Sequence, residues 1–163
     1  MTPWVTIIIL NFNNLDYTRF CLRSVLKTEY PNFKVIVADN GSEINEKRIL
    51  ESEFKDERIS FVRYNKNWGF VGGINRTVKK VKSEYVVFLN NDTIVTPNFL
   101  APLIKDFEND PEIACLQPQI RLSKDKDLLD GVGAFLTFTG FLYHFGYLKD
   151  RMQSKYNKKM KIF

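Results

Sequence analysis

Short apolar runs rich in β-branched residues alternate with helical patterns along most of the chain. Residues 5–10 combine valine, threonine, three isoleucines and leucine, which is typical of a strand buried on both faces. Apolar side chains in residues 17–26 then recur at helical spacing, with Asp16 in the position of a helix cap. Strands that alternate with helices pair in parallel through right-handed crossovers. The sequence therefore predicts an α/β fold whose central sheet is mostly parallel and flanked by helices.

The same alternation predicts the remaining elements. Further strands are expected at 33–38, 59–64, 85–89 and 113–116, and helices at 45–54, at 74–81 and after Thr96-Pro97. The length of 163 residues is enough for one domain with a hydrophobic core.

The net charge of +5 is concentrated at the C-terminal end. Residues 149–163 carry six cations and one anion, so they account for the whole excess and the preceding residues are formally neutral. A neutral body argues against a nucleic-acid-binding protein, which would need a basic face. We therefore expect one binding domain over residues 1–148, followed by a basic tail over 149–163.

The basic tail leaves two alternatives open. Met152, Tyr156 and Met160 recur at helical spacing among lysines, which is typical of a short amphipathic helix on an anionic membrane surface. A solvated chain end has the same composition. No signal peptide is visible, and Cys21 and Cys115 fit buried, reduced thiols. We expect a cytoplasmic protein, with attachment to the inner face of the membrane as the alternative that the tail leaves open.

Polar side chains gather where the predicted strands end. They are Asn11 and Asn13 after the first strand, Asp39 and Asn40 after the second, Asn65 and Asn67 after the third, and Asn90 and Asp92 after the fourth. In parallel α/β sheets, ligands bind beyond the carboxyl ends of the strands. The four strand ends therefore predict one composite binding site.

The tripeptide Asn90-Asn91-Asp92 is the sharpest of these motifs. A carboxylate and amide oxygens at a buried strand end suit a hard divalent cation, and Mg²⁺ takes one or two carboxylates plus substrate phosphates. A polar turn that caps the strand is the alternative.

Two other motifs also have a structural alternative. Asp39 could accept a hydrogen bond from the imide N–H of uracil or thymine, or it could form an Asx turn with Gly41 at positive φ. The glycine-rich loop 67–75 could let its backbone approach a ribose or a diphosphate, or it could pack Trp68 and Phe70 onto the core. This loop matches neither the dinucleotide-binding fingerprint nor a Walker loop, which disfavours an NAD-dependent protein. His144, the one histidine, is expected to be a packed or surface residue.

In this order along the chain, the motifs resemble those of family 2 glycosyltransferases of the GT-A fold, especially the rhamnosyltransferase-like branch. The resemblance runs from about Val5 to about Leu148. It implies a GT-A, Rossmann-like nucleotide-diphospho-sugar transferase fold. It also implies transfer of a sugar, with inversion, from a UDP- or dTDP-linked donor to a glycan or lipid-linked acceptor, with Mg²⁺ or Mn²⁺ as cofactor.

The resemblance also assigns roles to residues of this chain. Asp39 matches the position that reads the pyrimidine base. Metal binding falls to Asp92 and Asn90, the outer positions of a DxD-type motif. The remaining nucleotide-sugar-binding positions are Asn11 and Asn13 in the nucleoside pocket, Asn67, Gly73 and Asn75 beside the ribose and diphosphate, and Asn91 within the metal motif.

The acidic pair that supplies the general base in this family is missing from the sequence. After Asp130, the only acidic residue is Asp150. We therefore expect a chain truncated at its C-terminal side, with its catalytic base unassigned. The alternative is a catalytically incomplete nucleotide-sugar-binding or scaffold module derived from such an enzyme. A nucleotidyltransferase is disfavoured, because Asn11-Phe12-Asn13-Asn14 stands where its phosphate loop would follow the first strand.

Overall fold

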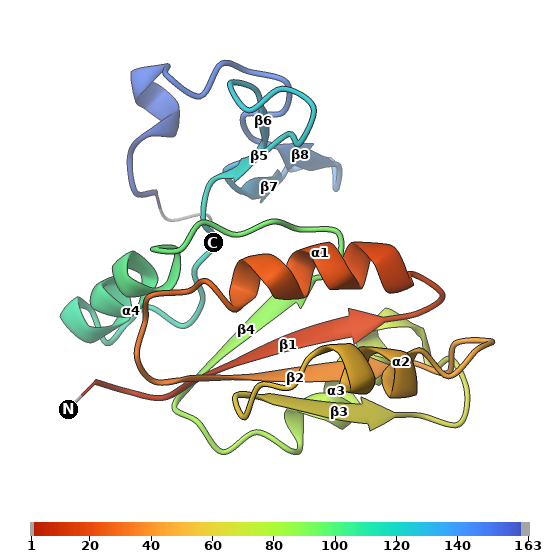
Figure 1. Cartoon of the computed structure of the whole chain (residues 1–163). Coiled ribbons are helices and arrows are strands. Elements are labelled where there is room, and N and C mark those ends of the chain that lie inside the picture. The colour runs from red at the N-terminus through yellow and green to blue at the C-terminus, as the bar shows by residue number, and fades with distance from the viewer. Residues whose placement is uncertain (1, 161–163) are drawn as a thin grey trace. The chain divides into compact units, whose positions relative to one another are not determined.

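The chain divides into two compact units, Met1–Pro102 and Leu103–Phe163. The computed structural model describes residues 2–160 (Figure 1). No helix among these residues is long and apolar enough to cross a membrane. The sequence predicts that the binding domain ends at residue 148. This boundary stays a prediction.

The first unit is built on a four-stranded parallel sheet in the order β3-β2-β1-β4. The strands are β1 (Val5–Asn11), β2 (Phe33–Asp39), β3 (Ile59–Arg63) and β4 (Tyr85–Asn90). The first five residues of β1, Val5 to Ile9, are all buried, so this strand lies at the centre of the core. The predicted α/β architecture with a mostly parallel sheet is confirmed.

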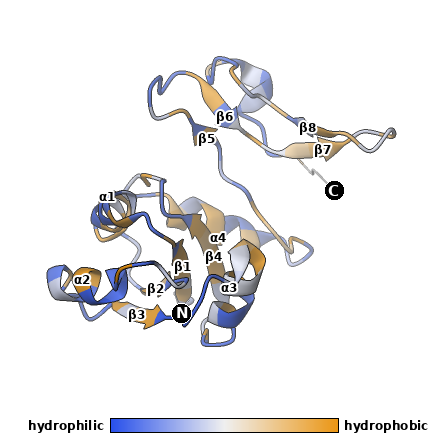
Figure 2. Cartoon of the chain, turned by 90° about the vertical axis from the view of Figure 1, so that its right-hand side faces the viewer, coloured by the Kyte–Doolittle hydropathy of each residue, from blue (hydrophilic) through white to orange (hydrophobic). Residues whose placement is uncertain are grey.

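Three helices cover the two faces of this sheet. They are α1 (Leu15–Val25), α2 (Glu46–Glu53) and α3 (Gly69–Val78). The chain advances in one direction from β1 through β2 to β3, and right-handed crossovers therefore place α1 and α2 on one face. The return from β3 to β4 runs the other way and places α3 on the opposite face, as Figure 2 shows. A further helix, α4 (Leu100–Asn109), begins in the first unit and continues into the second.

The second unit consists of short antiparallel pairs. β5 (Ile120–Arg121) pairs with β6 (Leu129–Gly131), and β7 (Ala134–Leu136) pairs with β8 (Leu142–His144). The 3₁₀ helix η1 (Ser154–Tyr156) follows. The Phe145 ring packs edge-on against the Phe135 ring at 5.7 Å and the Tyr156 ring at 5.0 Å. These rings and the buried Leu129 form the small core of this unit.

Two predictions for the second unit are wrong, and one of the two alternatives for the tail is not realised. Residues 113–116 form no strand, because no neighbouring strand pairs with them in the described part of the chain. Cys115 within this run is exposed, whereas Cys21 is buried as predicted. The tail forms no amphipathic helix over its described residues, since Tyr156 turns into the core of the unit while Met152 and Met160 stay exposed. An apolar run therefore does not form a strand where no other strand pairs with it, and a helical spacing of apolar residues does not by itself produce a helix.

Candidate functional site

The parallel register of the sheet brings the predicted site residues to one edge. Asn11 at the end of β1 stands opposite Asp39 of β2, and Asp39 stands opposite Arg63 of β3. On the other side of β1, Leu10 pairs with Asn90 of β4. We call this edge, where the four strands end, the carboxyl edge. The strand order reverses between β1 and β4, which is where ligands bind in open α/β sheets.

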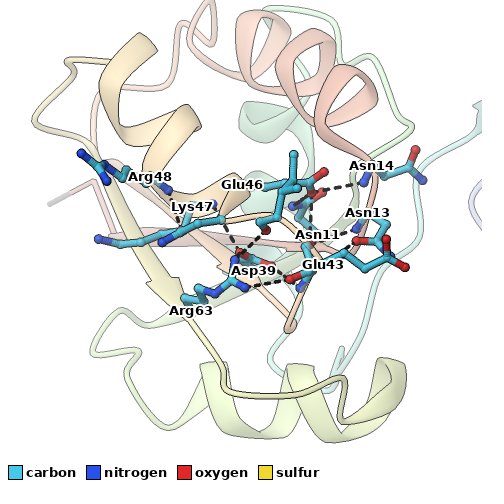
Figure 3. Close-up of polar contacts among 12 residues, drawn as sticks. Asn11, Asn13, Asn14, Asp39, Glu43, Glu46, Lys47, Arg48 and Arg63 are labelled. Atoms are coloured by element: carbon cyan, nitrogen blue, oxygen red, sulfur yellow. Dashed lines mark hydrogen bonds and ion pairs between the residues drawn. The ribbon is translucent and has the colours of Figure 1, made fainter.

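Asp39 lies at the centre of a tightly bonded turn (Figure 3). Its side chain is 1% exposed. One carboxylate oxygen accepts a 2.9 Å hydrogen bond from the backbone N–H of Ser42, and the other accepts one of 3.3 Å from the N–H of Lys47. Gly41 has φ +80°, so the predicted Asx turn with a glycine at positive φ is present. Base recognition by Asp39 stays a prediction, and both roles can coexist because a carboxylate offers about four acceptor sites.

Arg63 clamps this turn from β3. Its guanidinium donates a 2.6 Å hydrogen bond to Asp39 and bonds of 2.7 Å to the carbonyls of Ile44 and Ser42. Burying a carboxylate this deeply is costly unless it is paired and hydrogen-bonded, and Arg63 supplies a charged donor. Sequence reasoning missed Arg63, although a lone cation near the end of a predicted strand was a usable signal.

Asn11 is fully buried, and both ends of its amide are bonded inside the protein. Its Nδ2 donates to Glu46 Oε2 at 2.7 Å. Its Oδ1 accepts from the Thr18 hydroxyl at 2.8 Å and from Asn91 Nδ2 at 3.4 Å. Asn11 therefore supports the site from within the fold and joins the loops that follow β1 and β4.

Asn13 ties the loop after β1 to the turn after β2. Its own backbone N–H donates to Ser42 Oγ at 3.0 Å, and its Oδ1 accepts from the N–H of Glu43 at 2.8 Å. Asn13 has φ +50°, a left-handed conformation that asparagine tolerates better than most residues. Its side chain is exposed beside the carboxyl edge, where a ligand would bind.

The glycine-rich loop is organised by Asn40, which is buried. Asn40 Nδ2 donates to Asn67 Oδ1 at 2.9 Å and to the Gly69 carbonyl at 3.1 Å, while its Oδ1 accepts from the Trp68 N–H at 3.2 Å. A Cβ at Gly73 would lie 2.7 Å from the Leu10 side chain, so this glycine lets α3 pack closely on the end of β1.

Trp68 in this loop lies between two cations. The Arg76 guanidinium is 3.6 Å and the Lys66 ammonium 4.1 Å from the indole centroid. Trp68 is half-buried and packs against both cations, whereas Phe70, the other ring of the predicted packing, is exposed. Asn75 lies exposed on α3.

The predicted metal motif forms the turn after β4. The Asn90 side chain and Asp92 are exposed, and Asn91 turns inward to Thr18 Oγ1 at 3.0 Å. Burial, and secondarily the negative charge of Asp92, raise the pKa of the Cys21 thiol to about 12. Within residues 2–160, no group of three or more His, Cys, Asp or Glu side chains could hold a metal alone. One exposed carboxylate beside an amide oxygen still suits a cation that takes its other ligands from phosphates and water.

A continuous chain of hydrogen bonds links the Asp39 turn to this motif. Ser42 donates its backbone N–H to Asp39 and its hydroxyl to Glu46, at 3.1 Å. Glu46 in turn holds Asn11, which accepts from Asn91, the residue before Asp92. His144 lies exposed on β8 of the second unit, which fits the predicted surface residue.

Comparisons with known proteins identify the family and the fold. The family model described as glycosyl transferase family 2 matches residues 6–158. A poly-β-1,6-N-acetyl-D-glucosamine synthase of Staphylococcus epidermidis is 26% identical over 125 residues, which cover 77% of this chain and 30% of that protein. An uncharacterized glycosyltransferase of Rickettsia bellii is 28% identical over 130 residues, which cover 80% of this chain and 19% of that protein. The chain thus spans less than a third of the length of these relatives.

Solved structures share the fold. The mannosyltransferase PcManGT from Pyrobaculum calidifontis, in complex with GDP-Man and Mn²⁺, has a TM-score of 0.67 at 20% identity, over 87% of this chain and 44% of that one. S. aureus TarS 1–349 in complex with UDP-GlcNAc has a TM-score of 0.59 at 22% identity, over 65% of this chain and 31% of that one. The expected GT-A fold is therefore confirmed. The chain belongs to glycosyl transferase family 2.

Proposed function

We propose that this chain binds the donor in an inverting, metal-dependent transfer of sugar from a UDP- or dTDP-linked donor to a glycan or lipid-linked acceptor. One observation carries the proposal: the turn that contains Asp39 and the loop that contains Asp92 are joined by hydrogen bonds at the same carboxyl edge. TarS has been solved with UDP and UDP-GlcNAc, and PcManGT with GDP-Man, which supports a nucleotide sugar as the donor. The rhamnosyltransferase-like branch remains part of the proposal.

Asp39 would recognise the base through its remaining acceptor capacity. The turn and Arg63 use three of the approximately four acceptor sites of the carboxylate. The imide N–H of uracil or thymine would occupy the fourth. The N–H groups of Ser42 and Lys47 hold the carboxylate in place, so it would not reorient when the base arrives.

Asp92 and the Asn90 amide oxygen would hold Mg²⁺ or Mn²⁺ together with the diphosphate. When bound, such a cation would neutralise the negative charge that develops on the leaving diphosphate. Asn91 would fix the turn by its bond to Thr18, so that Asp92 and Asn90 face outward. Asn13, Asn67, Gly73 and Asn75 would contact the nucleoside and diphosphate, and the general base is unassigned.

Calorimetry with UDP, dTDP and GDP, each with and without Mn²⁺, tests this proposal on protein shown to be folded by circular dichroism. We expect UDP or dTDP to bind in the presence of Mn²⁺ and to lose most of its affinity when EDTA is added. GDP is the control for base recognition. The proposal is wrong if none of the three nucleotides releases heat.

A second candidate function is a donor-binding module without transfer activity. The observation that favours it is local to residues 131–160: Asp150 is the only carboxylate in this segment, and its Oδ1 accepts a 2.8 Å hydrogen bond from the Met152 N–H. A donor-hydrolysis assay separates the two functions. Release of free sugar from the donor favours the enzyme, whereas nucleotide binding without hydrolysis favours the module.

We also propose that the protein works in the cytoplasm and contacts the inner face of the membrane through basic residues of the tail. Among residues 149–160, Arg151 pairs with Asp127, Lys159 pairs with Asp106, and the Lys155 ammonium lies 4.9 Å from the Tyr156 ring centroid. Lys149, Lys155 and Lys158 are the cations of this described segment that we expect to face anionic lipid. Co-sedimentation with anionic liposomes tests this idea. Replacement of these three lysines by glutamine would leave co-sedimentation unchanged if the proposal is wrong.

A further inference from the structure

Glu46 is a buried carboxylate at the first residue of α2 for which the proposed chemistry has no use. It is 4% exposed. Three donors converge on its Oε2: Asn11 Nδ2 from the end of β1 at 2.7 Å, the Asn14 N–H from the loop after β1 at 3.2 Å, and the Ser42 hydroxyl from the turn after β2 at 3.1 Å. Burying a charge is costly, and an arrangement of this kind persists only where the donors compensate for lost water.

This carboxylate decides which way the Asn11 amide points. An asparagine amide has a donating and an accepting end, and their orientation is set by the groups around them. Since Oε2 can only accept, it attracts Nδ2 of Asn11, and the opposite end, Oδ1, must face Thr18 and Asn91. Asn91 then donates to both Oδ1 of Asn11 and the Thr18 hydroxyl.

The consequence extends from the turn after β2 to the turn after β4. Ser42 follows Asp39, the residue proposed to read the base, and Asn91 precedes Asp92, the proposed metal ligand. The hydrogen bonds found for the Glu46 side chain in the described part of the chain go to Asn11, Asn14 and Ser42, not to either of these aspartates. It holds the loop after β1 and the Ser42 hydroxyl on one side, and through Asn11 it orients Asn91 on the other.

We propose that Glu46 is a positioning residue that aligns the base-reading turn with the metal-binding turn by fixing the Asn11 amide. The proposal rests on the proposed function for its effect on nucleotide binding. The orientation of Asn11 and Asn91 can be tested without any nucleotide.

The test compares Glu46→Gln with two controls on the same helix. Glu51→Gln makes the same chemical change at an exposed residue that pairs with Lys47, and Leu50→Ala perturbs the core of α2 without touching the hydrogen bonds. In NMR spectra without nucleotide, we expect the side-chain NH₂ signals of Asn11 and Asn91 to shift in Glu46→Gln and to stay in place in Glu51→Gln. Leu50→Ala should lower the melting temperature and leave the Asn91 signal in place.

With nucleotide, Glu46→Gln should weaken Mn²⁺-dependent UDP binding about fivefold, because a neutral oxygen replaces a charge that strengthens each hydrogen bond. Glu51→Gln should bind as the original chain does. Unchanged Asn11 and Asn91 signals would overturn the proposal, and so would shifted signals with unchanged UDP affinity. If the original chain binds no nucleotide, the proposed function fails, and the NMR result alone decides the role of Glu46.

Thr18→Val provides a second variant if Glu46→Gln does not fold. It removes the hydroxyl between Asn11 and Asn91 while keeping the β-branched shape and the bond from Asn11 to Glu46. We expect the Asn91 NH₂ signal to shift and the Asn11 Nδ2 signal to move less. An unmoved Asn91 signal would contradict the proposal.

Discussion

Arg63 donates a 2.6 Å hydrogen bond to Asp39 from the residue directly opposite it in the parallel register. The same guanidinium reaches the carbonyls of Ile44 and Ser42, so one side chain closes the turn that follows β2. Three bonds from one rigid fork fix this turn more firmly than a lysine ammonium would.

Replacing Arg63 should therefore cost stability and nucleotide affinity together. For Arg63→Ala we expect a loss of about 2 kcal/mol in the free energy of unfolding, because a buried carboxylate and two carbonyls lose their donor. Urea denaturation measures this loss. Arg63→Lys should recover only part of it, and Arg48→Ala, at an exposed position of α2, should stay within about 0.5 kcal/mol of the original chain. Equal stabilities of Arg63→Ala and Arg48→Ala would contradict the interpretation.

Gly41 and Gly69 offer a matched pair of substitutions. Both have positive φ, +80° and +68°, but a Cβ at Gly41 would lie 2.3 Å from the Lys66 carbonyl carbon, whereas a Cβ at Gly69 meets nothing within 4 Å. We expect Gly69→Ala to cost about 1 kcal/mol, for the backbone conformation alone. Gly41→Ala should cost about 3 kcal/mol or more, because steric overlap adds to that strain. Thermal unfolding of the two variants would show similar melting temperatures if the close contact is absent.

The two cysteines should differ in reactivity. Burial raises the pKa of Cys21 to about 12, so its thiolate is scarce near pH 8, while Cys115 is exposed. We expect a thiol reagent to label one cysteine in the folded chain and both in denaturant. Because the raised pKa favours the protonated folded state, this group stabilises the fold fully below its unfolded pKa. That contribution is lost as the pH rises from about 8.5 towards 12. Cys21→Ala should flatten this alkaline loss, and equal labelling of both thiols would count against the prediction.

Asp92→Asn should separate metal binding from stability. Asp92 is exposed, so its replacement should change the free energy of unfolding by less than about 0.5 kcal/mol. Loss of the carboxylate should nevertheless remove most of the Mn²⁺ dependence of UDP binding. Titration of Mn²⁺ in the presence of UDP, followed by electron paramagnetic resonance, measures the effect. Asp106→Asn in the second unit is the control, and unchanged Mn²⁺ binding in Asp92→Asn would exclude Asp92 as a ligand.

The sheet and the edge at which the site lies could be predicted because they depend on local patterns. The apolar, β-branched run in residues 5–10 is typical of a strand that is buried on both faces. A polar residue that directly follows such a strand then lies at the carboxyl edge of the sheet. The register places Asn11 beside Asp39, and Asn91 donates a hydrogen bond to Asn11. The failure at 113–116 has the opposite cause, because pairing depends on a distant neighbour that composition does not reveal.

The supporting residues of the site could not be predicted in the same way. Glu46 begins a charged helix, so its residue type predicts a solvent-exposed side chain. Its partner Asn11 is 35 positions away in the sequence, and no local pattern connects the two. Only the crossover that lays α2 against the sheet brings its carboxylate beneath the loop after β1. Arg63 is likewise 24 residues away from Asp39 in the sequence, and only the pairing of β2 with β3 brings the two side chains together. Long-range placement, rather than residue type, gives these side chains their partners.

The close approach of Gly41 to the backbone of Lys66 has a consequence for how this domain can vary. Surface connections ordinarily accept extra residues, because they can bulge into water. Here two connections from neighbouring strands rest on one another with no side chain between them. An insertion in either connection would push the other one aside. Variation in loop length should therefore be confined to connections at the opposite edge of the sheet, where the strands begin.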